Sequence, residues 1–448
     1  MRIAIVGAGH VGLVSGACFA AVGHDVVALD VDRERVAMLE AGEAPFYEPG
    51  LAELLAASRA SGRLRFTADP AQGLAGAELA FVCVATPNDA RGHVDLSAVV
   101  AAARTVARHG EPEAVLVNRS TAPVGTARFL RSLVEEEREG EVLVAVNPEF
   151  LAEGSGVRDF LFPDRIVIGA WEPRAAERLH AAYAPIVAGD VPDGLPDGIA
   201  PTQRRAGPVP LVETNPPTAE LIKYATNAFL AMKISFINEM AGIAEEVGGD
   251  VTEVSRAVGL DRRIGPRFLR AGIGWGGSCF PKDIEALQGM AATHGLEARL
   301  LKAANDVNAD QHRWVIRKLQ RHLKTLVGRR VAMLGLAFKP DTDDVRNAPA
   351  LEIAHELARS SVRVRAYDPV VKAIPEELDG SIELVADPIS AARGAEAVVL
   401  VTEWPEFRGL DLEALGAVMR ERLLLDGRNY LDPEAVRAAG FTYVGVGR

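Results

Sequence analysis

The stretch from Arg2 to Leu13 reads Arg-Ile-Ala-Ile-Val-Gly-Ala-Gly-His-Val-Gly-Leu. Its first half, residues 2–6, is a short apolar run typical of a buried strand. Gly7, Gly9 and Gly12 follow with the spacing G-x-G-x-x-G, and residues 13–22 are rich in small and apolar side chains, as in a helix that packs on a sheet. A strand, a glycine-rich turn and a helix in this order predict the beginning of a Rossmann-type sheet.

A second apolar run, residues 25–30, ends in the acidic residue Asp30. In a Rossmann sheet the glycines let backbone N–H groups approach a pyrophosphate at the helix N-terminus, and the acid accepts hydrogen bonds from the adenosine ribose. A carboxylate there repels a 2′-phosphate, which favours NAD over NADP, although Arg33 and Arg35 lie close enough to weaken that preference. The alternative is a glycine-rich turn with a purely structural role. The first part of the predicted NAD site comprises Gly7, Gly9, Val11, Gly12, Asp30 and Arg35.

Composition limits the classes of function that the chain can have. It has 448 residues and a net charge of −12, which indicates more than one domain and argues against general nucleic-acid binding. We find no apolar run long enough to span a membrane, and glycines interrupt a weak resemblance to a signal peptide at the N-terminus. Three cysteines without a pairing pattern suit a reducing cytoplasm, and nine scattered histidines suggest no metal site.

The pattern of the first thirty residues returns near residue 330. Further strands are expected at 79–84, 114–117 and 142–146, a loop rich in Pro and Gly at 190–217, and one long helix at 218–247. More helix follows to about residue 322, interrupted by a glycine-rich stretch at 272–278. Residues 330–336 then repeat 2–8, and residues 362–368 repeat the strand that ends at Asp30, but the third glycine of the fingerprint is missing.

These patterns predict an α/β fold with two Rossmann-like, doubly wound domains joined by a central helical domain that contains one long helix. The expected boundaries are 1–212 for an NAD-binding domain, 213–322 for a central helical domain, and 323–448 for a second Rossmann-like domain.

Polar residues follow the predicted strands of the first domain. Thr86 and Thr121 each come just after a strand and are suited to contact a cofactor or a reacting oxygen, or alternatively to cap a helix. Glu149 and Glu153 follow the next strand, and on a helical turn residues four apart share a face. They are suited to proton transfer or to holding a water molecule, and the alternative is an acidic, solvated helix start.

Two more segments carry candidate chemistry. Lys223 and Asn227 are four residues apart on the long helix and could stabilise an oxyanion, although a lysine on a surface helix is ordinary. Cys279 ends the glycine-rich stretch, with Lys282 and Asp283 nearby to favour a thiolate and to position a base or a water. The alternative is a tight turn around a buried thiol, whereas Cys18 and Cys83 are expected in the core.

A nucleophilic cysteine beside an NAD site suggests oxidation in two steps. Removal of hydride from an alcohol yields an aldehyde, which a thiolate converts into a tetrahedral adduct. A second hydride can then leave, and water cleaves the resulting thioester to an acid. A 3-hydroxyacid-type dehydrogenase, which oxidises once and needs no cysteine, and a non-catalytic NAD sensor remain as alternatives.

Several segments in one order resemble the UDP-glucose/GDP-mannose dehydrogenase family over nearly the whole chain. Besides the fingerprint, the matching segments are Pro45–Leu51, Val84–Pro87, Ser120–Thr126, Asn147–Gly154, Glu220–Asn227, Gly276–Asp283 and Gly335–Asp344. Ser278 before the cysteine and Lys282 after it look like the UDP-glucose branch, and GDP-mannose remains an alternative substrate. Arg119 replaces the usual lysine, Ala122 the usual valine, and the 190–212 loop is longer than usual.

The resemblance implies a role for each matching residue. Cys279 is the expected nucleophile, and the other expected catalytic residues are Lys223, Asn227, Asp283, Thr121, Glu153 and Glu149. Further contacts to NAD are expected from Thr86, Thr121, Glu153, Lys282 and Arg346. The expected substrate contacts are Glu149, Phe150, Leu151, Ala152, Glu153, Lys223, Asn227, Phe268, Leu269, Arg270, Ala271, Gly272, Gly276, Phe338, Lys339, Arg428 and Arg263, the last lent across a dimer interface. The resemblance thus implies a cytoplasmic homodimer or higher oligomer that oxidises UDP-glucose to UDP-glucuronate. It also implies that residues 213–322 form the dimerisation domain and carry the catalytic cysteine, and that residues 323–448 bind the nucleotide sugar.

Overall fold

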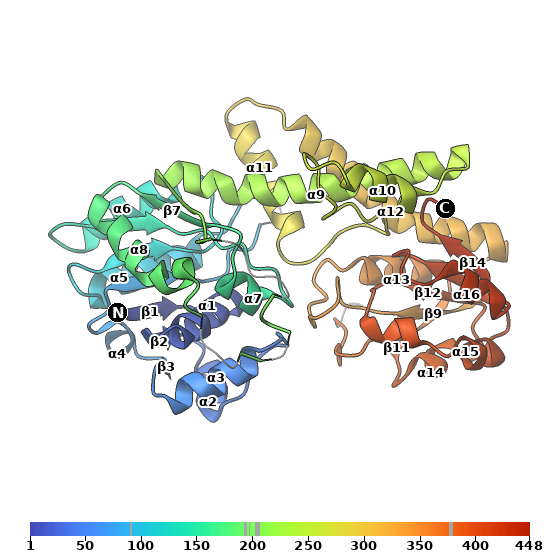
Figure 1. Cartoon of the computed structure of the whole chain (residues 1–448), viewed down its shortest axis with the longest axis horizontal. Helices are drawn as coiled ribbons and strands as arrows, with labels where there is room; N and C mark the ends of the chain where they lie inside the picture. The colour runs from blue at the N-terminus through green and yellow to red at the C-terminus, as the bar shows by residue number, and fades with distance from the viewer. Residues whose placement is uncertain (90–91, 192–194, 197, 202–206, 376–379) are drawn as a thin grey trace. The chain divides into compact units, whose positions relative to one another are not determined.

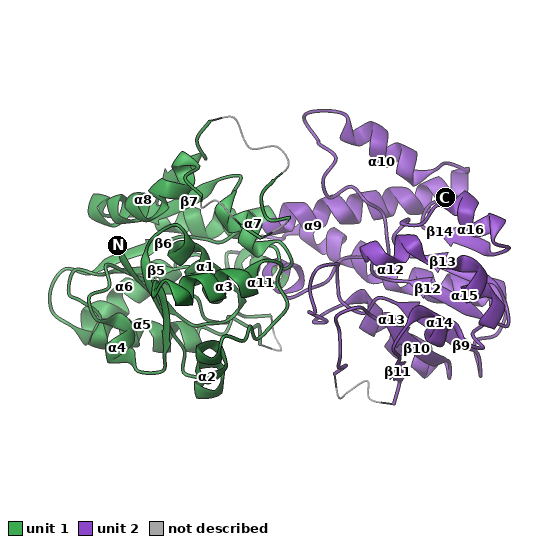
Figure 2. Cartoon of the chain, turned by 60° about the horizontal axis from the view of Figure 1, so that its bottom comes forward, with its two compact units in different colours: residues 1–226, 285–294 green, residues 227–284, 295–448 purple. Residues whose placement is uncertain are grey.

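The computed structural model describes residues 1–89, 92–191, 195–196, 198–201, 207–375 and 380–448. The chain divides into two compact units, which Figure 2 shows in different colours. Unit 1 contains residues 1–226 and 285–294, and unit 2 contains residues 227–284 and 295–448. Each unit is built around its own β-sheet.

Within the described residues, unit 1 holds an eight-stranded sheet with the order β3-β2-β1-β4-β5-β6-β7-β8 (Figure 1). Its neighbouring strands pair in parallel except β6 and β7, which pair antiparallel. Its strands are β1 (Arg2–Val6), β2 (Asp25–Leu29), β3 (Leu64–Thr67), β4 (Leu79–Val82), β5 (Val115–Asn118), β6 (Leu143–Val146), β7 (Ile166–Ala170) and β8 (Leu211–Thr214).

Helices cover both faces of this sheet, because its strands are apolar on both sides. One core holds side chains of α1, α3, α7 and α8, and the other holds side chains of α4, α5, α6 and the start of α9. The helices are α1 (His10–Ala21), α2 (Arg33–Ala41), α3 (Leu51–Ala60), α4 (Pro70–Leu74), α5 (Ser97–His109), α6 (Thr126–Glu137), α7 (Gly156–Leu161), α8 (Pro173–Ala188) and α9 (Pro216–Val247).

Unit 2 contains a six-stranded sheet over its described residues, parallel throughout, with the order β11-β10-β9-β12-β13-β14. Its strands are β9 (Arg330–Leu334), β10 (Arg363–Tyr367), β11 (Ile382–Leu384), β12 (Ala397–Leu400), β13 (Leu423–Asp426) and β14 (Thr442–Gly445). Its helices, besides most of α9, are α10 (Val251–Gly259), the start of α11 (Phe280–Thr293), α12 (Arg299–Leu323), α13 (Pro349–Arg359), α14 (Pro388–Ala392), α15 (Leu412–Val418) and α16 (Pro433–Ala438).

The expected fold class is confirmed, with two Rossmann-like sheets and a helical region between them in the sequence. The predicted long helix is α9, which begins two residues earlier than expected because Pro216 and Pro217 fit the first turn of a helix. The predicted loop at 190–217 was wrong at its end, where Leu211–Thr214 pairs with β7 as β8. Such a short strand gives little alternation to recognise. Residues 192–194, 197 and 202–206 of that loop lie outside the described residues.

The strand-terminal acid of the second sheet makes a contact equivalent to one in the first sheet, where the N–H of Ala8 donates to Asp30. Asp368 at the end of β10 accepts hydrogen bonds from the backbone N–H groups of Leu336 and Ala337 and from Nε1 of Trp404, at 2.7, 3.1 and 3.1 Å. The protein's own groups therefore engage this carboxylate, which corresponds in the repeat to Asp30.

Candidate active site

The fingerprint glycines of unit 1 lie where β1 turns into α1. Gly7 has a φ of 101°, and a Cβ atom on it would lie 2.8 Å from the carbonyl oxygen of Cys83. A Cβ on Gly12 would lie 1.9 Å from the Gly7 oxygen, so neither position has room for a side chain. A Cβ on Gly9 would instead meet no atom within 4 Å. Gly9 thus borders open space at the N-terminus of α1, which fits a pyrophosphate group.

Asp30 closes this loop and remains a candidate ribose ligand. It is buried, and its Oδ2 atom accepts a hydrogen bond of 2.7 Å from the N–H of Ala8. Oδ1 accepts from the N–H of Asp32 at 3.0 Å, and the guanidinium of Arg35 lies 3.3 Å from Oδ2. Arg35 therefore pairs with the carboxylate that was predicted to select NAD. Val11, the remaining predicted residue of this group, is half-buried in the first turn of α1.

Thr86 and Thr121, which follow β4 and β5, are brought together. The hydroxyl of Thr86 donates a hydrogen bond of 2.8 Å to the carbonyl oxygen of Thr121.

The loop after Thr121 leads into α6, and a side chain from another helix caps the first turn of α6. The carboxylate of Glu220 on α9 accepts hydrogen bonds from the N–H groups of Gly125 and Ala127, at 2.6 and 2.8 Å. Burial raises the pKa of Glu220 to about 7 despite these donors.

Glu149 and Lys223 form a buried ion pair within unit 1. Nζ of Lys223 lies 2.6 Å from Oε1 of Glu149, and each side chain is only 5% exposed. Burial by itself would raise the pKa of Glu149, but Lys223, Arg119 and a hydrogen bond from the Leu151 N–H outweigh it, and the pKa is lowered. Glu149 is therefore held as a carboxylate, and Nζ of Lys223 lies 5.7 Å from the centre of the Phe150 ring.

The predicted helical turn that places Glu149 and Glu153 on one face was wrong. Residues 147–152 are not helical, Glu153 lies in a turn, and α7 begins only at Gly156. Gly154 adopts a φ of 79°, and Oε2 of Glu149 accepts from the N–H of Leu151, so local hydrogen bonding competes with a helix here. Leu151 is half-buried, Ala152 is exposed, and Glu153 is half-buried.

The glycine-rich loop of unit 2 is held by buried amide side chains. Oδ1 of Asn238 accepts a hydrogen bond of 2.8 Å from the N–H of Gly272. Asn308 bonds to both backbone groups of Trp275, at 2.7 and 3.0 Å. Nη1 of Arg428 donates to the carbonyl oxygen of Gly274 at 2.9 Å. Arg428, a predicted substrate ligand, thus also supports the loop that leads to Cys279.

Cys279 follows two glycines that have no room for side chains. A Cβ on Gly276 would lie 2.0 Å from the carbonyl oxygen of Asn347, and one on Gly277 would lie 2.8 Å from the Phe338 ring. The thiol of Cys279 is half-buried and lies 3.5 Å from the hydroxyl of Ser278. This close packing explains why the loop before the cysteine is rich in glycine.

Asp283 gathers two of the other predicted groups in unit 2. It is 1% exposed, accepts a hydrogen bond of 2.6 Å from Nδ2 of Asn227, and lies 2.6 Å from Nζ of Lys282. Asn227 is itself buried. Lys282 is the neighbour of Asp283 in the sequence, whereas Asn227 lies 56 residues earlier and is brought into contact where α9 meets α11.

The three thiols differ in their surroundings. Burial raises the pKa of Cys83 to about 12 and also raises that of Cys18, so both are protonated at neutral pH. Both side chains belong to the core of unit 1, as expected from the sequence. Cys279 is half-buried, which leaves it as the thiol suited to react.

The remaining predicted residues of unit 2 differ in their exposure to solvent. Phe268 has a φ of 62° and is 39% exposed, which is unusual for a large aromatic residue, whereas Leu269 and Ala271 are buried and Arg270 is exposed. Nζ of Lys339 lies 5.5 Å from the centre of the Phe338 ring. Arg263 pairs with Asp261 at 2.6 Å, and Arg346 with Asp344 at 2.7 Å.

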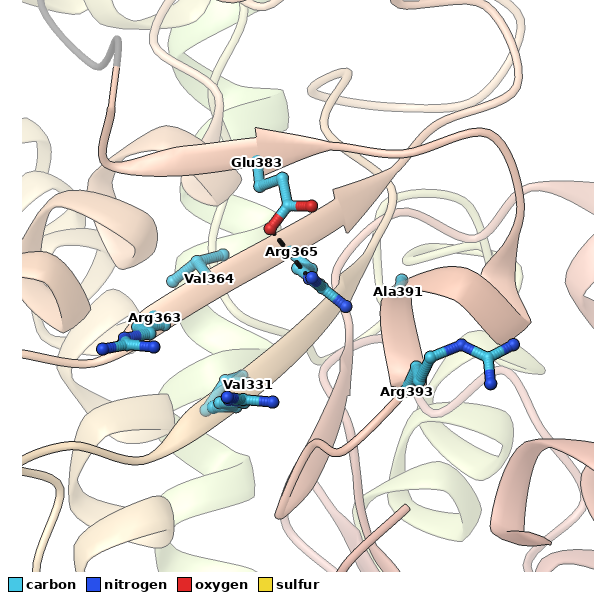
Figure 3. Close-up of a pocket in the computed structure, with 8 residues that line it drawn as sticks. Val331, Arg363, Val364, Arg365, Glu383, Ala391 and Arg393 are labelled. Carbon is cyan, nitrogen blue, oxygen red and sulfur yellow. Dashed lines mark hydrogen bonds and ion pairs between the residues drawn. The ribbon is translucent and has the colours of Figure 1, made fainter. Parts of the chain in front are cut away.

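A pocket of about 100 Å³ in unit 2 is lined by residues outside the predicted site (Figure 3). Arg330 and Arg363, the first residues of β9 and β10, line it together with Arg365. Arg365 pairs with Glu383, and Arg393 points away from the other labelled side chains. Ligands of parallel sheets bind at the carboxyl ends of the strands, so this cavity at the strand beginnings is not part of the candidate site.

Neither a metal centre nor a membrane span is found where the structure describes the chain. No group of three or more His, Cys, Asp or Glu side chains is placed to hold a metal ion among the described residues. None of the helices seen in the described ranges is long and apolar enough to cross a bilayer.

Sequence reasoning missed the buried polar groups that support the site. These are Glu48, Glu220, Asn238 and Asn308. Glu48 and Glu220 lie inside segments that the sequence had singled out, but nothing in those segments indicates which backbone groups they contact. The partners become visible only in the folded chain.

A Rossmann sheet with an open glycine turn defines a dinucleotide-binding protein, and comparison with known sequences defines it further. Models of the UDP-glucose/GDP-mannose dehydrogenase family match residues 1–187 (NAD binding domain), 217–310 (central domain) and 332–433 (UDP binding domain). The chain belongs to this family. Residues 1–187 are accordingly its NAD-binding domain.

Relatives match over the full length of the chain. A UDP-glucose 6-dehydrogenase of Pseudomonas aeruginosa is 44% identical, and the match covers 100% of this chain and 98% of that protein. A UDP-glucose 6-dehydrogenase of Rhizobium meliloti is 43% identical, and the match covers 100% of both proteins. Among solved structures, a UDP-glucose dehydrogenase of Pyrobaculum islandicum has a TM-score of 0.88 at 39% identity, covering 100% of this chain and 97% of that one. A UDP-D-ManNAc dehydrogenase of Pyrococcus horikoshii has a TM-score of 0.84 at 29% identity, covering 100% and 99%.

Proposed function

We propose that the protein oxidises UDP-glucose to UDP-glucuronate in two successive NAD-dependent steps, through a covalent adduct on Cys279. The observation that carries this proposal is the half-buried Cys279 at the end of a close-packed glycine loop, in a chain that also has an NAD-binding domain. An alcohol dehydrogenase that oxidises once has no use for such a thiol. The names of the full-length relatives support UDP-glucose as the substrate.

The proposed reaction balances as follows. The C6 alcohol loses a hydride and a proton to give an aldehyde. The Cys279 thiolate then forms a C–S bond to C6, and the former aldehyde oxygen takes up a proton. The adduct loses a second hydride and a proton to give a thioester, and water breaks the C–S bond to release a carboxylate, a proton and the thiol. Two NAD molecules accept the two hydrides, so each sugar consumes one water and yields two NADH.

The polar pairs of each unit suit particular parts of this reaction. In unit 1 Lys223, paired with Glu149, supplies positive charge for an oxyanion. In unit 2 the Asn227 amide and Asp283 offer a donor and a proton acceptor next to Lys282. We assign the water that cleaves the thioester to Thr121 and Glu153.

The substrate and cofactor contacts are proposed from the same resemblance. NAD is held by the fingerprint loop, where Gly9 leaves room for a pyrophosphate, and by Asp30. Further NAD contacts are assigned to Val11, Arg35, Thr86, Thr121, Glu153, Lys282 and Arg346. The nucleotide sugar is assigned to Glu149–Glu153, Phe268–Gly272, Gly276, Phe338, Lys339, Arg428 and, from a second copy, Arg263.

The proposed assembly is a homodimer, or a higher oligomer built from it, in the cytoplasm. Helix α9 exposes Phe229, Phe236 and Ile243, which repeat every seven residues, and these side chains are 57%, 48% and 51% exposed. Val247 continues the apolar stripe at 75% exposure. A second copy of the same helix fits this stripe, because a two-fold axis brings identical surfaces together.

We also propose that the chain has three domains, with boundaries of 1–212, 213–322 and 323–448.

One assay tests the proposed reaction. Purified protein is incubated with NAD and, in parallel, UDP-glucose, GDP-mannose and UDP-N-acetyl sugars, and NADH formed is counted per sugar consumed. We expect two NADH with UDP-glucose, and a loss of acid product by roughly 10³-fold or more in Cys279→Ser. Cys18→Ala serves as the control thiol. Full turnover in Cys279→Ser, or one NADH per sugar in the wild type, would overturn the thioester mechanism.

A further inference from the structure

The Glu48 carboxylate lies between two functional loops of unit 1. It belongs to the Pro45–Leu51 segment, and its side chain is fully buried. Oε2 lies 2.8 Å from Nε2 of His10 and accepts a hydrogen bond of 2.8 Å from the N–H of Gly154. Oε1 accepts a hydrogen bond of 2.8 Å from the N–H of Gly156. One carboxylate therefore contacts three donors on two separate segments.

The first of these segments is the dinucleotide loop. His10 is the first residue of α1 and directly follows Gly9 of the fingerprint. Its ring packs against Phe46, with centroids 4.9 Å apart, so the Pro45–Leu51 segment holds it from two sides. A pyrophosphate at the N-terminus of α1 would bind at the backbone of this same turn. Any ligand that orders the turn therefore also orders His10.

The second segment carries the acids of the candidate site. Gly154 directly follows Glu149–Glu153, Gly156 comes two residues later, and the Glu48 carboxylate accepts hydrogen bonds from the N–H groups of both glycines. A displacement of His10 therefore reaches this loop through the Glu48 carboxylate, which contacts both segments.

We infer that Glu48 is a positioning residue that couples the dinucleotide loop to the Glu149–Gly156 loop. NAD fixes the first turn of α1 and His10, His10 orients the Glu48 carboxylate, and the carboxylate fixes the backbone that presents Glu149 and Glu153. Glu48 itself touches neither cofactor nor sugar. This inference rests on the proposed function for the role of the two acids, but its central contacts are independent of the substrate.

A purely structural role for Glu48 is the competing interpretation. The side chain of Ser155, the N-cap of α7, makes no capping hydrogen bond, and Glu48 supplies one to Gly156 instead. A cap contributes stability of about 0.5–2 kcal/mol but does not transmit the binding of a ligand. The test must therefore measure how the acid loop responds to NADH, as well as the stability of the fold.

Hydrogen exchange of residues 149–156 with and without NADH gives that measurement. In the wild type we expect NADH to slow exchange of these amides by about 10-fold. Glu48→Gln keeps the shape, but its amide group cannot accept hydrogen bonds at both oxygen positions, so one glycine N–H loses its acceptor. In this variant we expect NADH to change exchange of 149–156 less than about two-fold, while the first turn of α1 is still protected.

Two further variants and a kinetic measurement complete the test. Glu43 is exposed and lies, like Glu48, between α2 and α3, so Glu43→Gln should behave as the wild type. His10→Phe keeps a ring against Phe46 but removes the contact with Glu48, and it should lose the response as Glu48→Gln does. With UDP-glucose, Glu48→Gln should lower kcat by roughly 10–100-fold, a larger effect than on the KM of the sugar.

The outcomes separate the inference from the proposed function. If NADH protects residues 149–156 equally in the wild type, Glu48→Gln and His10→Phe, or does not protect them in the wild type, the inference is wrong. If Glu48→Gln lowers only the melting temperature, Glu48 is a cap and the inference is also wrong. If the wild type shows the response but oxidises no nucleotide sugar, the coupling stands and the proposed function fails.

Discussion

Raising the pH from 5 to 8 should destabilise the folded protein through Glu220 on α9. Burial raises the pKa of this carboxyl group from its ordinary value of 4.5 to about 7, although the N–H groups of Gly125 and Ala127 partly offset the effect. The native state therefore keeps a proton that the unfolded chain releases. The resulting stabilisation is complete below pH 4.5, declines as the pH rises, and is lost above about pH 7.

The size of the effect follows from the two pKa values. A change from 4.5 to about 7 corresponds to about 3 kcal/mol of unfolding free energy, of which about 2.5 kcal/mol is lost between pH 5 and pH 8. Glu220→Gln removes the titrating group and with it this part of the pH dependence. The substitution also alters the cap of α6, but this effect on the unfolding free energy is the same at every pH. It therefore cancels when the two pH values are compared.

Urea unfolding at pH 5 and pH 8 checks this expectation. The wild type should lose about 2.5 kcal/mol more than Glu220→Gln between these pH values. Glu246→Gln, at an exposed position of the same helix, serves as the control and should follow the wild type. If the wild type and Glu220→Gln change by the same amount within about 0.5 kcal/mol, Glu220 does not titrate as a buried group and the reasoning is refuted.

Two further substitutions test the cofactor loop and the assembly. Gly12→Ala places a Cβ 1.9 Å from the Gly7 carbonyl oxygen, so NADH affinity measured by fluorescence should fall by about 10-fold or more. Gly242→Ala, where a Cβ meets no atom within 4 Å, is the control, and equal affinities would contradict this steric argument. Phe236→Glu should convert the assembly to monomers in analytical ultracentrifugation, because it buries a charge in an apolar contact. An unchanged mass would exclude the α9 stripe as that contact.

Local patterns were sufficient to predict the frame of the molecule. The strand–glycine–helix order places β1, the fingerprint and α1, and its repetition places the second sheet. Apolar spacing likewise predicts α9. These features depend on residues that are close together in the chain. Gly12, for example, has no room for a side chain because the carbonyl oxygen of Gly7 lies beside it.

Contacts between distant segments were beyond the reach of sequence patterns. The spacing of Glu149 and Glu153 suggests a helical turn, but local hydrogen bonding and the turn at Gly154 prevent it. The caps provided by Glu220 and Glu48 come from segments far away in the sequence. The sequence does not show whether an acidic side chain faces solvent or accepts hydrogen bonds from two backbone N–H groups.

The different surroundings of the three thiols make the protein suitable for quantitative labelling. Cys18 and Cys83 are buried and protonated at neutral pH, whereas Cys279 is half-buried. A small alkylating reagent should therefore modify one sulfur per folded chain, and the bound label would count the molecules with an intact glycine loop. Specific activity could then be expressed per competent molecule instead of per milligram, and unfolding would be detected as the second and third sulfur become labelled.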